Sequence, residues 1–112
     1  MEVRAVVKDT GVSARKVRPL VDMVRGKKVD EALALLKFAH TPTAQVVAKL
    51  VKSAAANAEN NFQLSRADLK IVTIFADEAR RLKRFRPVAR GRAAPILKRS
   101  SHITVIVAGE EV

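Results

Sequence analysis

Three segments of the chain carry the apolar pattern of β-strands. Apolar and polar positions alternate through residues 2–8, with Val3, Ala5 and Val7 on one face and Arg4 and Lys8 on the other. Residues 69–76, LKIVTIFA, are β-branched and apolar, and residues 102–107, HITVIV, alternate in a similar way. These segments predict a small antiparallel sheet of about three strands.

Helical spacing dominates residues 13–60. Apolar residues recur at i, i+3, i+4 and i+7 in the first helix, with Ser13 placed as its N-cap and Gly26 as its stop: Val17, Leu20, Val21 and Val24. Pro19 lies inside this pattern and lacks a backbone N–H, so we expect a bend or a delayed start.

Two more helices follow. We expect Asp30 to cap a short one that runs to about Phe38, and Thr41-Pro42 to start the longest one, which runs to about Asn60. The small residues 53–56, SAAA, predict close packing of that helix against the sheet. The fold class is therefore α+β, with about three antiparallel strands packed against three helices.

Residues 80–99, here called the basic arm, lie between the last two strands. Two strands on either side of one segment predict a long basic β-hairpin that projects from the body, with its turn near Arg90-Gly91-Arg92. Pro87 and Pro95 cannot donate ladder hydrogen bonds, so regular pairing should fray between them. Ten residues in each limb would reach roughly 30 Å.

Charge is concentrated in this arm. The chain has 22 Lys and Arg against 11 Asp and Glu, and the arm holds nine of the basic residues and no acidic one. Such a block repels itself unless a polyanion binds it, and a pI near 11 is typical of nucleic-acid binders. A basic protein of membrane surfaces is the competing interpretation. No apolar run approaches the roughly 20 residues needed to span a bilayer.

The length of 112 residues predicts one domain, and the absence of cysteine excludes a disulfide framework and thiolate metal sites and suits a cytosolic protein. With four Phe and no Tyr or Trp, the chain has few rings for base stacking, so recognition through phosphate, sugar and folded RNA shape is favoured. Phe85 is the exception. We expect no cofactor and no enzymatic activity, because the two histidines are far apart in sequence and no phosphate-loop or dinucleotide fingerprint is present.

The first helix offers a second basic surface. Only Asp22 opposes its cations, which are Arg15, Lys16, Arg18, Arg25, Lys27 and Lys28. These residues are either phosphate contacts or solvated surface charges, and we favour phosphate contacts.

Several motifs resemble the ribosomal protein L22 family. They are residues 13–18, SARKVR; 24–27, VRGK; 53–58, SAAANA; and, most specifically, 82–84, 89–93 and 97–105, which read LKR, ARGRA and LKRSSHITV. The resemblance covers essentially the whole chain. Ala14 stands where the family more often has proline, and Pro19 is less usual, which affects only the geometry of the first helix.

The resemblance implies one L22-like domain over residues 1–112, with a body of about 1–79 and 100–112 and a hairpin of about 80–99. It implies a cytoplasmic component of the large ribosomal subunit that binds large-subunit rRNA, aids assembly and contacts neighbouring ribosomal proteins. The family's hairpin forms part of the wall of the polypeptide exit tunnel, facing the nascent polypeptide, and macrolide antibiotics act in the same tunnel.

Carried onto this sequence, the resemblance places residues of the hairpin tip at the tunnel: Leu82, Lys83, Arg84, Phe85, Arg86, Pro87, Val88, Ala89, Arg90, Gly91, Arg92, Ala93 and Ala94. The expected rRNA contacts are Arg15, Lys16, Arg18, Arg25, Lys27, Lys28, Arg80, Arg81, Lys83, Arg84, Arg86, Arg90, Arg92, Lys98, Arg99, Ser100 and His102. Two other classes stay open. One is a free-standing regulator that binds DNA or messenger RNA, and the other is a general binder of polyanionic surfaces.

Overall fold

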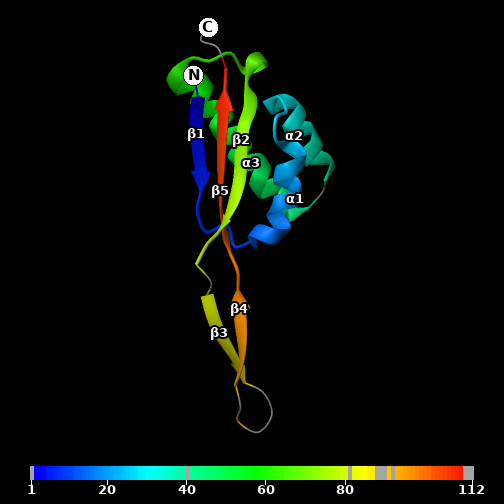
Figure 1. Cartoon of the computed structure of the whole chain (residues 1–112), viewed down its shortest axis with the longest axis vertical. Coiled ribbons are helices and arrows are strands. Elements are labelled where there is room, and N and C mark those ends of the chain that lie inside the picture. Colours follow the sequence, from blue (N-terminus) through cyan, green and yellow to red (C-terminus); the bar gives the residue numbers. More distant parts are fainter. Residues whose placement is uncertain (1, 40, 81, 88–90, 92, 110–112) are drawn as a thin grey trace.

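The chain forms a helix-and-sheet body from which a narrow two-stranded arm extends (Figure 1). The computed structural model describes residues 2–39, 41–80, 82–87, 91 and 93–109, with residues 82–87 and 93–97 described by their backbone. Its principal dimensions are 67 × 26 × 17 Å. The elements in chain order are β1 (Glu2–Val7), α1 (Ala14–Val24), α2 (Val29–Phe38), α3 (Pro42–Phe62), a 3₁₀ turn η1 (Arg66–Asp68), β2 (Lys70–Glu78), β3 (Leu82–Pro87), β4 (Ala93–Lys98) and β5 (Ser101–Ala108).

The body is built on an antiparallel sheet of order β1-β5-β2. Val3 pairs with Val107, Ala5 with Val105 and Val7 with Ile103, so the alternating positions identified in the sequence lie on one face of the sheet. On β2 the same face carries Ile71 and Ile74, with a register shift between Ile71 and Thr73. The three strand predictions and their antiparallel pairing are confirmed.

All three helices cover that face, and the core lies between the two layers (Figure 1). α3 packs against β1 and β5, α1 packs against β2, and α2 packs on α3. Ala54 and Ala55 of α3 are fully buried, which confirms the close approach expected from the small residues, while Ser53 and Ala56 are exposed. The predicted α+β class is confirmed.

The first helix does not start late. α1 begins at Ala14, directly after Ser13, and continues through Pro19. Proline at this position cannot donate to the carbonyl of Arg15, and its ring crowds that carbonyl. The helix continues nevertheless, with Ala14, Val17, Val21 and Val24 buried along its core face. The predicted stop is correct, because Gly26 follows the helix with φ +79° and its N–H donates to the carbonyl of Ile71 at 3.1 Å.

The caps of the other two helices differ from one another. Lys28, not Asp30, occupies the N-cap position of α2; Asp30 lies in the first turn, where its carboxylate accepts from Nε of Arg66 at 3.2 Å. The predicted end at Phe38 is correct. Thr41 caps α3 as expected, since its hydroxyl accepts from the N–H of Ala44 at 3.1 Å, and the helix ends two residues beyond Asn60.

The arm is a two-stranded antiparallel hairpin whose register runs from Leu82↔Lys98 to Pro87↔Ala93. The predicted hairpin is confirmed, and Gly91 lies in its turn with φ +70°. Pairing continues through Phe85↔Pro95 and as far as Pro87↔Ala93. Residues 88–90 and 92, most of the segment between the two prolines, lie outside the described residues, so the expected fraying there stays a prediction. Both strands of an isolated pair are edge strands, so alternate N–H groups point outward, and proline can occupy such positions without loss of a ladder bond.

Candidate nucleic-acid interface

The loop after β1 is bonded to the start of β5 at the base of the arm. The N–H of Thr10 donates to the carbonyl of Ser101 at 3.1 Å, and the two hydroxyl oxygens lie 2.9 Å apart. The side chain of Ser101 is fully buried. This contact joins residues 91 positions apart and fixes the β1–α1 loop where the arm leaves the body.

Ser100 and His102 complete this junction. The Ser100 hydroxyl accepts from the N–H of Gly11 at 2.9 Å, and its carbonyl accepts from the N–H of Ala79 at 3.0 Å. Nδ1 of His102 accepts from the N–H of Asp9 at 3.0 Å, which in this arrangement leaves Nε2 to carry the proton. Both residues were predicted rRNA contacts, and the structure gives each of them a role in holding the loop.

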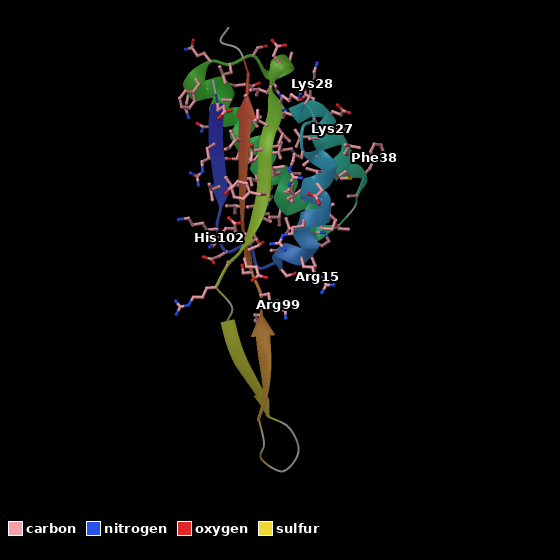
Figure 2. The ribbon with its side chains drawn as sticks, in the orientation of Figure 1. Arg15, Lys27, Lys28, Phe38, Arg99 and His102 are labelled. Atoms are coloured by element: carbon pink, nitrogen blue, oxygen red, sulfur yellow. The ribbon has the colours of Figure 1, made fainter. Side chains whose placement is uncertain are left out.

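The junction brings the N-terminus of α1 beside the arm. A hollow of about 540 Å³ is lined by Lys16 from α1 and by Lys98 and Arg99 from the arm. A second hollow of about 440 Å³ is lined by Arg80, Lys98 and Arg99, with Asp9 among its walls. Arg15 and Arg99 line a third, very small one together with Glu78. We refer to Arg15, Lys16, Arg80, Lys98 and Arg99 as the arm-base cluster. Figure 2 shows two of its members, Arg15 and Arg99, where the arm meets the body.

The arm-base cluster is exposed and positively charged. None of its five side chains forms an ion pair with another described residue, and all five are exposed. Ser13 occupies the N-cap position of α1, yet its side chain makes no capping bond within the described residues. The N-terminus of α1 carries the positive end of the helix dipole, and this end of the helix lies beside the arm-base cluster. This arrangement suits an anion with several charges, such as a nucleic-acid backbone.

The structure separates the basic residues of the first helix into two groups. Lys27 and Lys28 lie at the opposite end of α1 from Arg15 (Figure 2). Lys27 Nζ is 3.8 Å from a carboxylate oxygen of Glu31. The guanidinium of Arg25 donates to the Asp22 carboxylate at 2.7 Å and to the carbonyl of Ile74 at 2.9 Å. Arg25 thus ties α1 to β2, whereas Arg18 is exposed on the helix between the two groups.

Much of the predicted tip is outside the region in which side chains are described. Val88, Ala89, Arg90 and Arg92 of the tip lie outside the described residues, as does Arg81, a predicted rRNA contact. The other predicted tip residues apart from Gly91 are described by backbone. Gly91 is exposed, and a Cβ there would meet nothing within 4 Å among the described atoms.

Sequence reasoning missed Asp9, Thr10 and Gly11, which build the junction. The sequence shows two polar runs, Asp9-Thr10-Gly11 and Ser100-Ser101-His102. A single sequence carries no signal that two segments about 90 residues apart are in contact. Among the described residues there is no group of three or more His, Cys, Asp or Glu suited to a metal ion. Within the same part of the chain, no helix is long and apolar enough to cross a membrane.

Comparison with known proteins agrees with the fold and the charge. Residues 5–108 match the family model described as ribosomal protein L22p/L17e. A large ribosomal subunit protein uL22 from Dehalococcoides mccartyi is 72% identical over 108 residues, which cover 96% of this chain and 99% of the relative. The proteins of the same name from Pediococcus pentosaceus and Clostridium novyi are 53% and 51% identical over 96% of this chain, and the matches cover 92% and 96% of those relatives. These similarities extend over nearly the whole chain, and it therefore belongs to the ribosomal protein L22 family.

Proposed function

We propose that this chain is a structural constituent of the large ribosomal subunit, where it binds the subunit's RNA and aids assembly. The observation that carries this proposal is the arm-base cluster, which gathers cations from α1 and from both limbs of the arm around open hollows. The relatives are named as proteins of the large ribosomal subunit, and we infer that this chain binds RNA in the same particle. Membership of a family of ribosomal proteins also agrees with the expectation that the chain is not an enzyme.

The chemistry of the cluster favours a phosphate backbone. Each phosphate neutralised by Lys or Arg releases condensed counterions, which gives a log–log salt slope of about −0.7 to −0.9 per contact. Arginine supplies seven of the nine arm cations, and its planar donor array can bind two phosphate oxygens at once. The rRNA contacts proposed from the sequence remain as given, and the arm-base cluster is their centre. Arg25, Ser100 and His102 also form hydrogen bonds within the body, so part of their contribution is to hold the RNA-binding surface in place.

The arm is proposed to line the nascent-polypeptide exit tunnel. Its backbone is only two strands wide, with the paired strands about 5 Å apart, and this extended shape suits a narrow passage inside the particle. Residues 82–94 would then face both RNA and the emerging polypeptide, and macrolide antibiotics would bind nearby. The body would contact neighbouring ribosomal proteins.

Co-sedimentation of the full chain with large subunits that lack it, at graded salt, tests the proposal. We expect stoichiometric binding at low salt and a loss of several orders of magnitude in affinity over a few-fold rise in salt, as about six phosphate contacts would produce. Binding of the same affinity to random duplex DNA, to messenger RNA and to anionic vesicles would instead favour a general polyanion binder. Selective binding to one DNA or messenger RNA would favour the free-standing regulator.

A further inference from the structure

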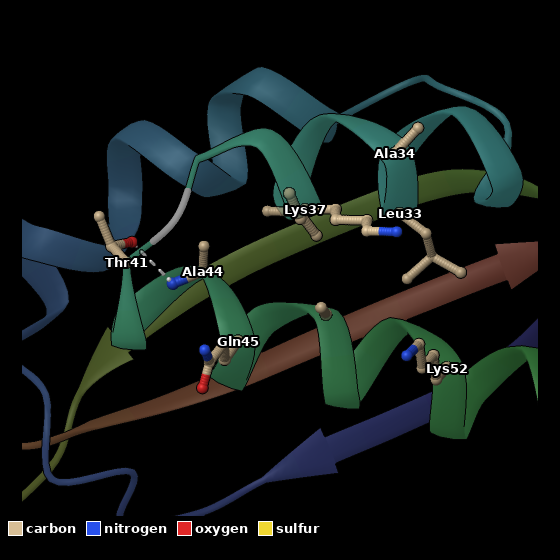
Figure 3. A pocket seen from close by; sticks show the side chains of 9 residues that line it. Leu33, Ala34, Lys37, Thr41, Ala44, Gln45 and Lys52 are labelled. Carbon is tan, nitrogen blue, oxygen red and sulfur yellow. Dashed lines mark hydrogen bonds between the residues drawn. The ribbon is translucent and has the colours of Figure 1, made fainter.

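A groove between α2 and α3 shares no lining residue with the hollows of the arm-base cluster (Figure 3). It has a volume of about 580 Å³. Its floor is aliphatic, formed by Leu33, Ala34 and Leu36 of α2 and by Ala44 and Ala48 of α3. Ala44 and Leu36 are core residues, so the groove is the outer edge of the α2–α3 contact rather than a gap between loosely placed side chains.

Two lysines stand on the two sides of this groove. Lys37 comes from α2 and Lys52 from α3 (Figure 3). Both side chains are exposed, and neither forms an ion pair with a described residue. Among the described lining residues there is no Asp or Glu. The groove therefore combines an apolar floor with a positive rim that lacks a partner in the described structure.

Phe38 extends the apolar surface beyond the groove. It is 79% exposed, and it lies four positions after Ala34, on the same side of α2. Figure 2 shows Phe38 pointing away from the body. A large aromatic side chain this exposed, next to an apolar groove, is typical of a surface that is covered by a partner.

The dimensions and the chemistry fit one class of occupant. From Thr41 to Lys52, α3 rises about 16 Å, which is about three helical turns and long enough for apolar side chains at i, i+3, i+4 and i+7 of a second helix. A phosphate backbone would use the two lysines but would leave the aliphatic floor exposed to water. An amphipathic helix with acidic residues beside its apolar face would cover the aliphatic floor and pair with the two lysines.

We propose that the α2–α3 groove docks an acidic amphipathic helix of a neighbouring protein, with its apolar side chains on the floor and its carboxylates beside Lys37 and Lys52. This inference goes beyond RNA binding, since it assigns a protein partner to a face that the RNA-binding proposal does not use. It rests on the proposed function only in one respect, namely that the partner is a protein of the large ribosomal subunit.

A designed peptide of about 18 residues, with Leu at i, i+3, i+4 and i+7 flanked by Glu, provides a probe that requires no ribosome. On titration into the ¹⁵N- and methyl-labelled full chain, we expect shifts confined to residues of the groove, including Ala34 and Ala48. A peptide of the same composition in scrambled order should cause none. Shifts spread evenly over the chain, or equal binding of the two peptides, would overturn the proposal.

Charge reversal on the rim separates specific docking from general attraction. The double variant Lys37→Glu with Lys52→Glu should weaken peptide binding about tenfold, because each exposed ion pair contributes a few-fold in affinity and its reversal adds repulsion. The matched control is Lys8→Glu with Lys70→Glu, an exposed lysine just after β1 and one in β2, which makes the same change in net charge and should leave the affinity within about twofold. An equal loss in both variants would overturn the proposal.

Cross-linking in the assembled particle identifies the occupant. A photoreactive phenylalanine analogue at the exposed position 34 should form an adduct with a protein segment that carries Asp or Glu beside aliphatic residues. An adduct with RNA, or with a basic segment, would overturn the proposal even if RNA binding by the arm is confirmed. Conversely, the peptide titration uses the free chain, so its result is independent of whether the proposed ribosomal function holds.

Discussion

The hydroxyl oxygens of Thr10 and Ser101 lie 2.9 Å apart, although the residues are 91 positions apart in the chain. Ser101 is the first residue of β5, and the basic arm ends just before it. The Thr10 hydroxyl also accepts from the N–H of Val12, so the contact orders the loop that leads into α1. Through this contact the geometry of the body determines how the cations of α1 and of the arm lie relative to one another.

We predict that Ser101→Ala lowers the free energy of unfolding by about 1 kcal/mol, because it removes a hydrogen bond at a fully buried site. The midpoint of thermal unfolding should fall by about 4 °C. Ser53→Ala, at an exposed position of α3, is the control and should change stability by less than about 0.5 kcal/mol. A Ser101→Ala protein as stable as the original would show that the junction does not depend on this hydroxyl.

If the arm-base cluster contacts phosphates, its cations should contribute to the salt dependence of RNA binding. We predict that Lys16→Gln with Arg99→Gln reduces the log–log salt slope by about 1.5, the value for two lost phosphate contacts. Lys37→Gln with Lys52→Gln removes the same charge from the α2–α3 groove and should leave the slope unchanged, because we assign that groove to a protein. Titration of large-subunit RNA at several salt concentrations measures both, and equal slopes for the two double variants would contradict the assignment.

Gly26 should tolerate substitution poorly for reasons of backbone conformation. Its φ of +79° is strained for a residue with a Cβ, although a Cβ there would meet no atom within 4 Å. We predict that Gly26→Ala costs about 1 kcal/mol in unfolding free energy, and that Gly26→Asn costs less because asparagine visits this region more readily. Chemical denaturation measures both, and an alanine variant as stable as the asparagine variant would argue against strain as the cause.

Removal of the arm should leave the body folded. Leu82 and Lys98 are paired across the hairpin, so an Asn-Gly turn can replace residues 82–98 without moving the body strands. The described core comes from β1, β2, β5 and the helices, so we expect a change of less than about 0.5 kcal/mol in unfolding free energy. The shortened chain should retain weaker RNA binding through α1. Loss of cooperative unfolding would show instead that the arm supports the body.

The sequence predicted the elements well where one physical signal acts alone. Thr41-Pro42 is an unambiguous helix start, and the alternation around Val105 placed Ile103, Val105 and Val107 on the core face. It failed where two signals compete. Pro19 looked like an obstacle to the first helix, yet the helix runs through it, with Val17 and Val21 buried in the core on either side. Asp30 looked like a cap, yet its carboxylate pairs with Arg66, 36 positions away.

The candidate site shows the same limit. The nine cations of the arm could be counted from the sequence, but the meeting of Lys16 with Arg99 depends on the loop bonded to Ser100 and Ser101. The α2–α3 groove was not anticipated, because its floor consists of residues that sequence periodicity assigns to ordinary helix packing, such as Leu33 and Ala48. Contacts between distant segments are set by the tertiary fold, and single-sequence patterns carry no direct signal for them.

A cryo-electron microscopy map of large subunits that contain this chain tests the central claim most directly. We predict density for the arm within the particle, with residues 82–94 at the wall of the exit tunnel and phosphates beside Lys16, Lys98 and Arg99. A map in which the arm points into solvent, with no RNA at the arm-base cluster, would contradict the account.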